Sequence, residues 1–116
     1  MQKQLKNCIR LRSQIKIYVP STYEVDKDID NQKHVDETIE FLAKIFGGAT
    51  VTEAYGAWIS ANGQLVKEFV SLVFAFAGQE QLEQSIDAIY DYCIKLKLEL
   101  KQESIALEIN GELYLI

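Results

Sequence analysis

Residues that commonly build catalytic and metal sites are scarce in this 116-residue sequence. It contains one histidine (His34), two cysteines (Cys8 and Cys93) and one proline (Pro20). Two cysteines this far apart provide neither a disulfide framework nor the closely spaced ligands of a zinc site. The serines lack the surrounding pattern of a nucleophile elbow. We therefore predict no catalytic residue, no metal site and no cofactor.

Long apolar runs are absent as well. No stretch approaches the roughly 20 residues that a membrane-spanning helix needs. The N-terminal stretch is basic, but charges interrupt it and no apolar block follows, so we expect no secretory signal. Apolar residues make up 48% of the chain and charged residues 25%, which is the balance of one globular domain. We expect a reduced, cytoplasmic protein.

The charge is distributed unevenly along the chain. Residues 1–16 carry five basic groups and no acid, whereas residues 17–116 carry seven basic and seventeen acidic groups, a net −10. We divide the chain into a basic N-terminal arm, 1–13, and a single domain, 14–116. Such an arm can bind nucleic acid or dock on an acidic face of its own or a neighbouring subunit. The arm has no aromatic residue to stack on a base, so nucleic-acid binding is the less favoured hypothesis.

Apolar spacing predicts the regular elements. Alternation over 14–20 predicts a strand, and spacings of three and four residues predict helices over 31–46 and 79–101. Gly47-Gly48 is expected to end the first helix, because glycine adopts the left-handed conformation of a helix C-cap. The range 94–101 also alternates like a strand, but the helical spacing continues through it and favours a helix.

A hairpin joins the two predicted helices. Asn62-Gly63 is typical of a two-residue hairpin turn, which would pair Ile59 with Val66 and place Trp58 and Phe69 on one face. The second strand, 68–77, is apolar on both faces. Either it is covered on both sides, or its second face meets another subunit.

The order of elements predicts the fold. Strand, helix, strand, strand and helix are followed by a short hairpin around Asn110-Gly111. This order indicates the α+β class: a ferredoxin-like α/β sandwich with an antiparallel sheet and two helices on one face.

An acidic loop before the first helix partly matches a calcium-binding loop. Asp26, Asp28, Asp30 and Glu37 occupy four of its charged positions. The position that requires glycine is Asn31, and a strand rather than a helix precedes the loop. We interpret these acids as solvated groups near a helix N-terminus.

The run GATVTEAYG, residues 48–56, resembles the helix-to-strand passage of the PII signalling proteins, which are small trimeric proteins of ferredoxin-like fold. The resemblance implies that Thr50 lines a nucleotide cleft between subunits, and it makes this run the candidate ligand site. The candidate ligand-binding residues are Thr50, Thr52, Glu53, Tyr55 and Gly56.

The chain also departs from the PII pattern. Trp58 replaces the last glycine of that pattern, the tight turn at Asn62-Gly63 replaces the mobile loop, and the phosphate loop is missing. The sequence also resembles small uncharacterised bacterial proteins, which implies no activity.

Aromatic and apolar residues of the predicted sheet mark a candidate interface. The set is Tyr18, Trp58, Phe69 and Val73. If the helices cover the opposite face, this surface fits a contact in a homo-oligomer, a dimer or a trimer. A small-molecule pocket at a subunit boundary is the second interpretation.

Three functions remain open at this point. The leading hypothesis is a non-enzymatic, self-associating regulatory or ligand-binding domain, because no catalytic constellation is visible. The first alternative is a small ferredoxin-like enzyme with a pocket between sheet and helices, in which Tyr55, His34 or Glu53 acts as acid or base. The second alternative is nucleic-acid binding through the basic arm.

Overall fold

The structure is a computed structural model and describes residues 3–24 and 27–116. The order of its elements matches the predicted order, with three short additions before the first long helix: one 3-10 helix and two strands. The elements are η1 (Lys3–Asn7), β1 (Ser13–Pro20), β2 (Thr22–Tyr23), β3 (Lys27–Asp28), α1 (Gln32–Phe46), β4 (Thr50–Ile59), β5 (Leu65–Ala77), α2 (Gln79–Leu100), β6 (Ala106–Ile109) and β7 (Glu112–Leu115).

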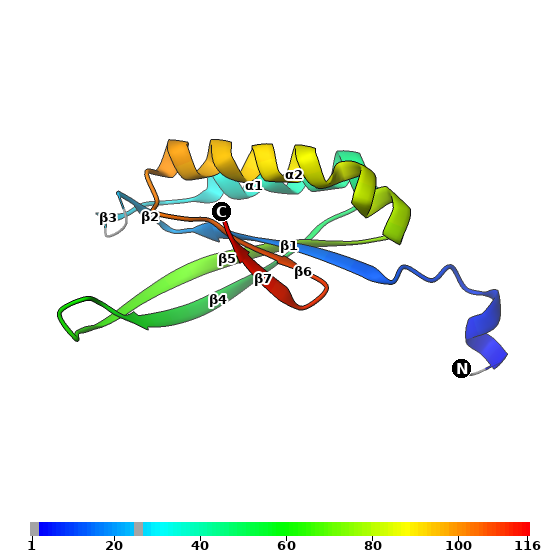
Figure 1. The fold of residues 1–116 in the computed structure, drawn as a ribbon, viewed down its shortest axis with the longest axis horizontal. Helices are drawn as coiled ribbons and strands as arrows, with labels where there is room; N and C mark the ends of the chain where they lie inside the picture. Colours follow the sequence, from blue (N-terminus) through cyan, green and yellow to red (C-terminus); the bar gives the residue numbers. More distant parts are fainter. Residues whose placement is uncertain (1–2, 25–26) are drawn as a thin grey trace.

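Five strands form one antiparallel sheet in the order β4-β5-β1-β6-β7. Both helices lie on the same face of this sheet, and no helix among the described residues covers the opposite face (Figure 1). The predicted ferredoxin-like α+β fold is therefore confirmed. The β4–β5 hairpin is long and projects beyond the helical layer (Figure 1).

The core lies between the sheet and the helices. On α1 the buried residues are Val35, Thr38 and Leu42, which share one helical face. On α2 burial recurs every three or four residues and reaches Leu96 and Leu100, so the helix continues through the ambiguous range 94–101. The sheet contributes alternate residues of β1 and β5, which are Ile15, Ile17, Val19, Val73, Ala75 and Ala77.

The register of the β4–β5 hairpin corrects the predicted one by one residue. Ser60 donates its backbone N–H to the carbonyl of Gln64 at 2.8 Å, so three residues rather than two form the loop. Gly63 takes a φ of +82°, the left-handed residue that completes a three-residue loop. Trp58 consequently pairs with Val66, and Tyr55 pairs with Phe69.

This shift separates residues that were predicted to share a face. Side chains alternate along a strand, so a slip of one residue moves every side chain to the other face. Trp58 and Phe69 therefore point to opposite faces of the hairpin, against the prediction. Val73 is fully buried beneath the helices, whereas Tyr18 lies on the helix-free face. The four candidate interface residues do not form one surface of the chain.

The helix-free face of the sheet is largely apolar. Its residues follow from the register and include Trp58, Leu72, Phe74, Phe76, Leu113 and Leu115. Phe76 remains 51% exposed and Leu115 70% exposed. Two explanations were open for a strand that is apolar on both faces: cover on both sides, or contact with another subunit. Within a single chain, the helices cover only one face of β5, so the first explanation does not hold.

The N-terminal segment lies apart from the domain. Residues 3–12 are all exposed and extend away from the sheet (Figure 1). Residues 3–7 form a short 3-10 helix. Across the residues that the structure describes, neither helix has the length and apolar character needed to cross a membrane.

In the acidic segment before α1, β2 pairs with β3 in an antiparallel manner. Asp26, one of the four residues that matched a calcium loop, lies outside the described residues. The side chain of Asp30 accepts a hydrogen bond from the backbone N–H of Gln32 at 3.0 Å. This contact fits the interpretation of Asp30 as an acid near a helix N-terminus.

Candidate active site

Two cavities meet at Glu68, on the part of β5 that precedes its pairing with β1. The first has a volume of about 330 Å³ and the second about 210 Å³. Ser21, Asp28, Ile29, Tyr55, Lys67 and Phe69 line the first together with Glu68. Trp58, Gln102, Glu103 and Ser104 line the second together with Glu68. We refer to this region as the Glu68 site.

Segments far apart in the sequence hold the Glu68 side chain in place. The Thr22 hydroxyl donates a hydrogen bond to the Glu68 carboxylate at 3.5 Å. The side-chain amide of Gln102 donates to the Thr22 carbonyl at 3.0 Å and approaches the Thr22 hydroxyl at 3.4 Å. On the neighbouring strand the residue opposite Glu68 is Gly56, and a Cβ there would meet no atom within 4 Å. The carboxylate is thus anchored on one side and faces open space on the other.

The environment of Glu68 raises the pKa of its carboxyl group. Burial is the largest cause, the negative charge of Asp28 adds to it, and the hydrogen bond from Thr22 opposes it. A carboxyl group with a raised pKa, placed in a cavity, can take up and release a proton closer to neutral pH. Within the described residues, Glu68 is the carboxyl group that combines a raised pKa with cavity walls.

Aromatic rings lie on both faces of the hairpin around Glu68: Trp58 shares the face of Glu68, and Tyr55 and Phe69 lie on the opposite face. Tyr55 and Phe69 lie with their ring centroids 5.0 Å apart and tilted by 55°, both largely exposed. Trp58 lines the second cavity from the helix-free side. The Ser21 hydroxyl fixes β5 here by donating to the Phe69 carbonyl at 2.5 Å. Aromatic faces beside carboxylates can bind a ligand that has a planar ring and a positive charge.

The structure brings only part of the predicted ligand set to this site. Tyr55 lines the first cavity, and Gly56 pairs with Glu68. Thr50 and Thr52 lie nearer the other end of β4, and Thr50 lines a separate hollow with Phe74 and Phe76.

Glu53 belongs to a polar cluster that joins neighbouring elements. Its two carboxylate oxygens lie 3.0 and 2.8 Å from the Ser71 hydroxyl oxygen. The Asn31 amide also donates to this hydroxyl, at 3.2 Å. These contacts connect β4, β5 and the start of α1, and they give Glu53 a structural role.

The acid–base residues proposed for the enzyme alternative do not form one group. Tyr55 lines the Glu68 site, but His34 lies on α1 with its Nδ1 atom 3.9 Å from a carboxylate oxygen of Glu99 on α2. Sequence reasoning missed Glu68. The sequence feature that could have identified Glu68 is a single carboxylate between Val66 and Val70, on an otherwise apolar face of a strand.

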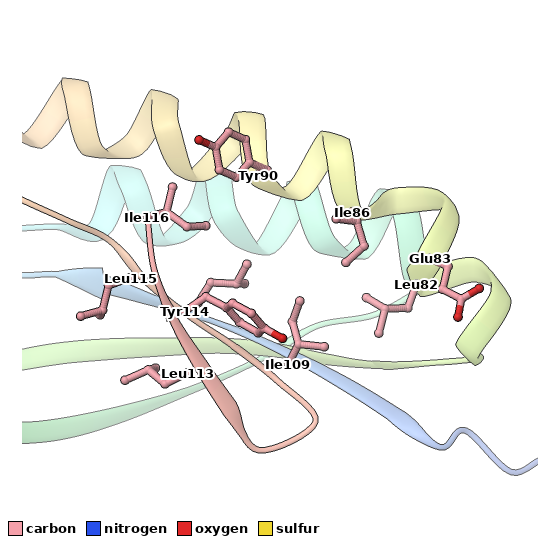
Figure 2. A pocket seen from close by; sticks show the side chains of 10 residues that line it. Leu82, Glu83, Ile86, Tyr90, Ile109, Leu113, Tyr114, Leu115 and Ile116 are labelled. Atoms are coloured by element: carbon pink, nitrogen blue, oxygen red, sulfur yellow. The ribbon is translucent and has the colours of Figure 1, made fainter.

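A larger apolar groove lies between α2 and the β6–β7 hairpin (Figure 2). Its volume is about 830 Å³. The residues that line it are Leu82, Glu83, Ile86, Tyr90, Leu107, Ile109, Leu113, Tyr114, Leu115 and Ile116. Glu83, Tyr90 and Tyr114 supply its few polar side-chain groups. Its chemistry suits binding of apolar surface, whereas the Glu68 site has groups suited to a reaction.

Cys93 is not available as a nucleophile. It is fully buried in the core, and burial raises the pKa of its thiol to about 12. The thiolate form that reacts is therefore strongly disfavoured at neutral pH.

Two solved structures share this fold over nearly the whole chain. A phage SAM lyase in complex with S-methyl-5'-thioadenosine superposes with a TM-score of 0.66 at 22% identity, covering 94% of this chain and 94% of that chain. A phage SAM lyase in its apo state superposes with a TM-score of 0.64 at 22% identity, covering 90% and 87%. No family model matches the chain, and neither does any curated protein.

These likenesses correct the leading functional hypothesis. The chain was predicted to be a non-enzymatic, self-associating regulatory or ligand-binding domain, but both matching structures are those of an enzyme. They support the first alternative, a small ferredoxin-like enzyme with a pocket between sheet and helices, better than the leading hypothesis. Kinship with the PII signalling proteins stays a prediction, as does a cytoplasmic location.

Proposed function

We propose that this protein is a lyase that cleaves a carbon–sulfur bond of S-adenosylmethionine or a closely similar sulfonium nucleoside. The observation that carries the proposal is the fold likeness to a phage SAM lyase bound to S-methyl-5'-thioadenosine, which extends over 94% of both chains. The Glu68 site supports it, because carboxylates and aromatic rings there match the positive sulfonium and the planar adenine of such a substrate.

The residues of the Glu68 site have distinct roles in this proposal. A ring face on which adenine can stack is provided either by the exposed pair Tyr55 and Phe69 or by Trp58 on the opposite face of the hairpin. Asp28 contributes negative charge to the cavity that Glu68 also lines, which attracts the sulfonium centre. Glu68 has the raised pKa that suits a proton acceptor.

The bond that breaks joins the sulfur to the aminobutyryl chain, and its electron pair goes to the sulfur. The sulfonium becomes the neutral thioether of S-methyl-5'-thioadenosine. The carbon that loses sulfur must then gain electrons within the substrate, since a lyase adds no water. In a β-elimination, Glu68 takes the proton from the neighbouring carbon, and a double bond forms. In an internal displacement, the carboxylate of the substrate attacks the carbon and closes a ring, and Glu68 only orients the chain.

The activity is tested with the full chain and S-adenosylmethionine in ¹⁸O-enriched water. We expect S-methyl-5'-thioadenosine to form well above the buffer control, with no ¹⁸O in the primary products. If the reaction is the β-elimination, Glu68→Gln should lower kcat about 100-fold or more, as expected for loss of an acid–base group. Glu80→Gln, at an exposed position on α2, is the matched control and should retain full activity. Substrate decay equal to that in buffer would refute the proposal.

We further propose that the enzyme acts as a homo-oligomer formed through the helix-free face. This face is apolar and carries both Trp58 and the Glu68 side chain. A second copy placed there would cover the open side of the Glu68 site and remove water from it.

A further inference from the structure

Three metal-ligating side chains meet between the two helices, in the helical layer of the fold. His34 and Glu37 lie three residues apart on α1 and therefore share one helical face. Glu99 lies in the last turn of α2. One ligand atom from each of the three residues lies within 4.8 Å of the other two. None of the three lines either cavity of the Glu68 site.

The His34 ring nitrogen that faces this cluster lacks a hydrogen-bond partner. The Nδ1 atom is buried and unpaired, and it lies 3.9 Å from a carboxylate oxygen of Glu99. The His34 side chain as a whole is 16% exposed. A buried polar nitrogen without a partner is unfavourable, so this atom indicates a missing ligand.

We propose that His34, Glu37 and Glu99 bind a divalent transition-metal ion, with zinc as the best fit. One imidazole and two carboxylates form a nitrogen–oxygen ligand set that suits zinc, and water would complete a tetrahedral site. Calcium and magnesium prefer all-oxygen sites with more ligands.

The geometry needs only a small adjustment. Zinc bonds of about 2.0–2.2 Å place tetrahedral ligands about 3.4 Å apart. The three ligand atoms must therefore approach one another by about 1.5 Å at most. Glu99 can supply this movement, because its side chain is 41% exposed.

The backbone around His34 is already held against α2. The Thr38 hydroxyl donates to the His34 carbonyl at 2.7 Å, and its oxygen lies 2.8 Å from the Tyr92 hydroxyl oxygen. The Thr38 hydroxyl has one hydrogen, so Tyr92 is the donor in the second bond. A bound ion would extend this link by fixing the start of α1 to the end of α2.

The test uses the full chain with Cys8→Ser, because Cys8 is an exposed thiol that can bind zinc by itself. The protein is stripped with EDTA and titrated with ZnCl₂, and the imidazole NMR signals are recorded. His34 is the only histidine, so these signals report on the proposed ligand directly. We expect saturable binding of one ion, shifted His34 ring signals and a higher Tm. Magnesium chloride should shift nothing.

Variants separate this site from adventitious zinc binding. Glu99→Gln and Glu37→Gln should each weaken zinc affinity at least about tenfold, as loss of a ligand requires. Glu40→Gln, on the exposed side of α1 where Glu40 pairs with Lys44, is the matched control and should bind as tightly as the parent. Unchanged His34 ring signals at five equivalents of zinc would overturn the proposal. Zinc affinity in both ligand variants equal to that of the parent would overturn it as well. Circular dichroism checks that each variant is folded.

Discussion

At the scale of single residues, Glu68 combines a proposed catalytic role with a cost to stability. Its pKa is raised above the ordinary value of 4.5, so the folded state binds its proton more tightly than the unfolded state does. The resulting contribution to stability is present at low pH and is lost as pH rises through the folded-state pKa. A neutral side chain at this position avoids that loss.

We therefore predict that Glu68→Gln stabilises the protein at pH 7, while it lowers activity if the reaction is the β-elimination. Glu68 is only half-buried, so solvent screening keeps the gain to a fraction of 1 kcal/mol. This corresponds to about 1–3 °C in Tm for a domain of this size. Thermal denaturation should show the gain at pH 7 and a smaller difference at pH 4. A lower Tm for Glu68→Gln than for the parent at pH 7 would contradict the assignment.

Sequence reasoning missed Glu68 because its environment is built from distant residues. Thr22 lies 46 positions before it, and Gln102 lies 80 positions from Thr22. Periodicity describes one element at a time, so it does not show which loop lies beside a given strand. The meeting of His34 with Glu99 escaped prediction for the same reason.

At the scale of elements, the end of α1 depends on a single glycine. Gly47 takes a φ of +91° and donates its backbone N–H to the Ala43 carbonyl at 2.8 Å. Gly48, the next residue, has no positive φ. A Cβ at either position would meet no atom within 4 Å, so the two glycines differ only in backbone conformation.

We predict that Gly47→Ala destabilises the protein by about 1 kcal/mol, because a left-handed conformation is strained for alanine. Gly48→Ala should be neutral or stabilise by a few tenths of a kcal/mol, since it restricts the unfolded chain. Urea denaturation of both variants measures the difference. Equal losses in the two variants would show that space, not conformation, decides the effect.

The elements themselves were predictable, but the register of the β4–β5 hairpin was not. Both helices follow from apolar spacing, and the Asn110-Gly111 turn joins Ile109 to Glu112 as a two-residue loop. Asn62-Gly63 has the same sequence, yet Ala61 joins its loop. Two-residue and three-residue loops both accept these residues, and the choice between them reverses the faces of β4 and β5.

At the scale of the whole molecule, the fold could be derived and the function could not. Element order and the two-faced apolar strand led to a ferredoxin-like sheet with one open face. The same architecture supports many activities, so a scarcity of histidine and cysteine misled the functional interpretation. A carboxylate with a raised pKa and nearby aromatic rings requires neither residue.

The open face leads to the last prediction, which concerns assembly. Phe76 lies on this face opposite Gln14, while its neighbours Ala75 and Ala77 are buried under the helices. An exposed apolar sheet face of this kind favours association. Phe76 is 51% exposed, so a charge there should disturb an interface more than the fold of one chain.

Sedimentation of the parent at about 10–50 µM should give the mass of a dimer or a trimer of the 13.2 kDa chain. Phe76→Glu should dissociate the assembly and lower lyase activity, because the Glu68 site would lose its cover. Leu98→Glu, at a 69% exposed position on α2, is the matched control on the helical side and should leave the assembly intact. A parent protein that sediments as a monomer throughout this range would rule out the contact. An assembly that survives Phe76→Glu would instead place the contact elsewhere, and the apolar groove between α2 and the β6–β7 hairpin would be the next surface to test.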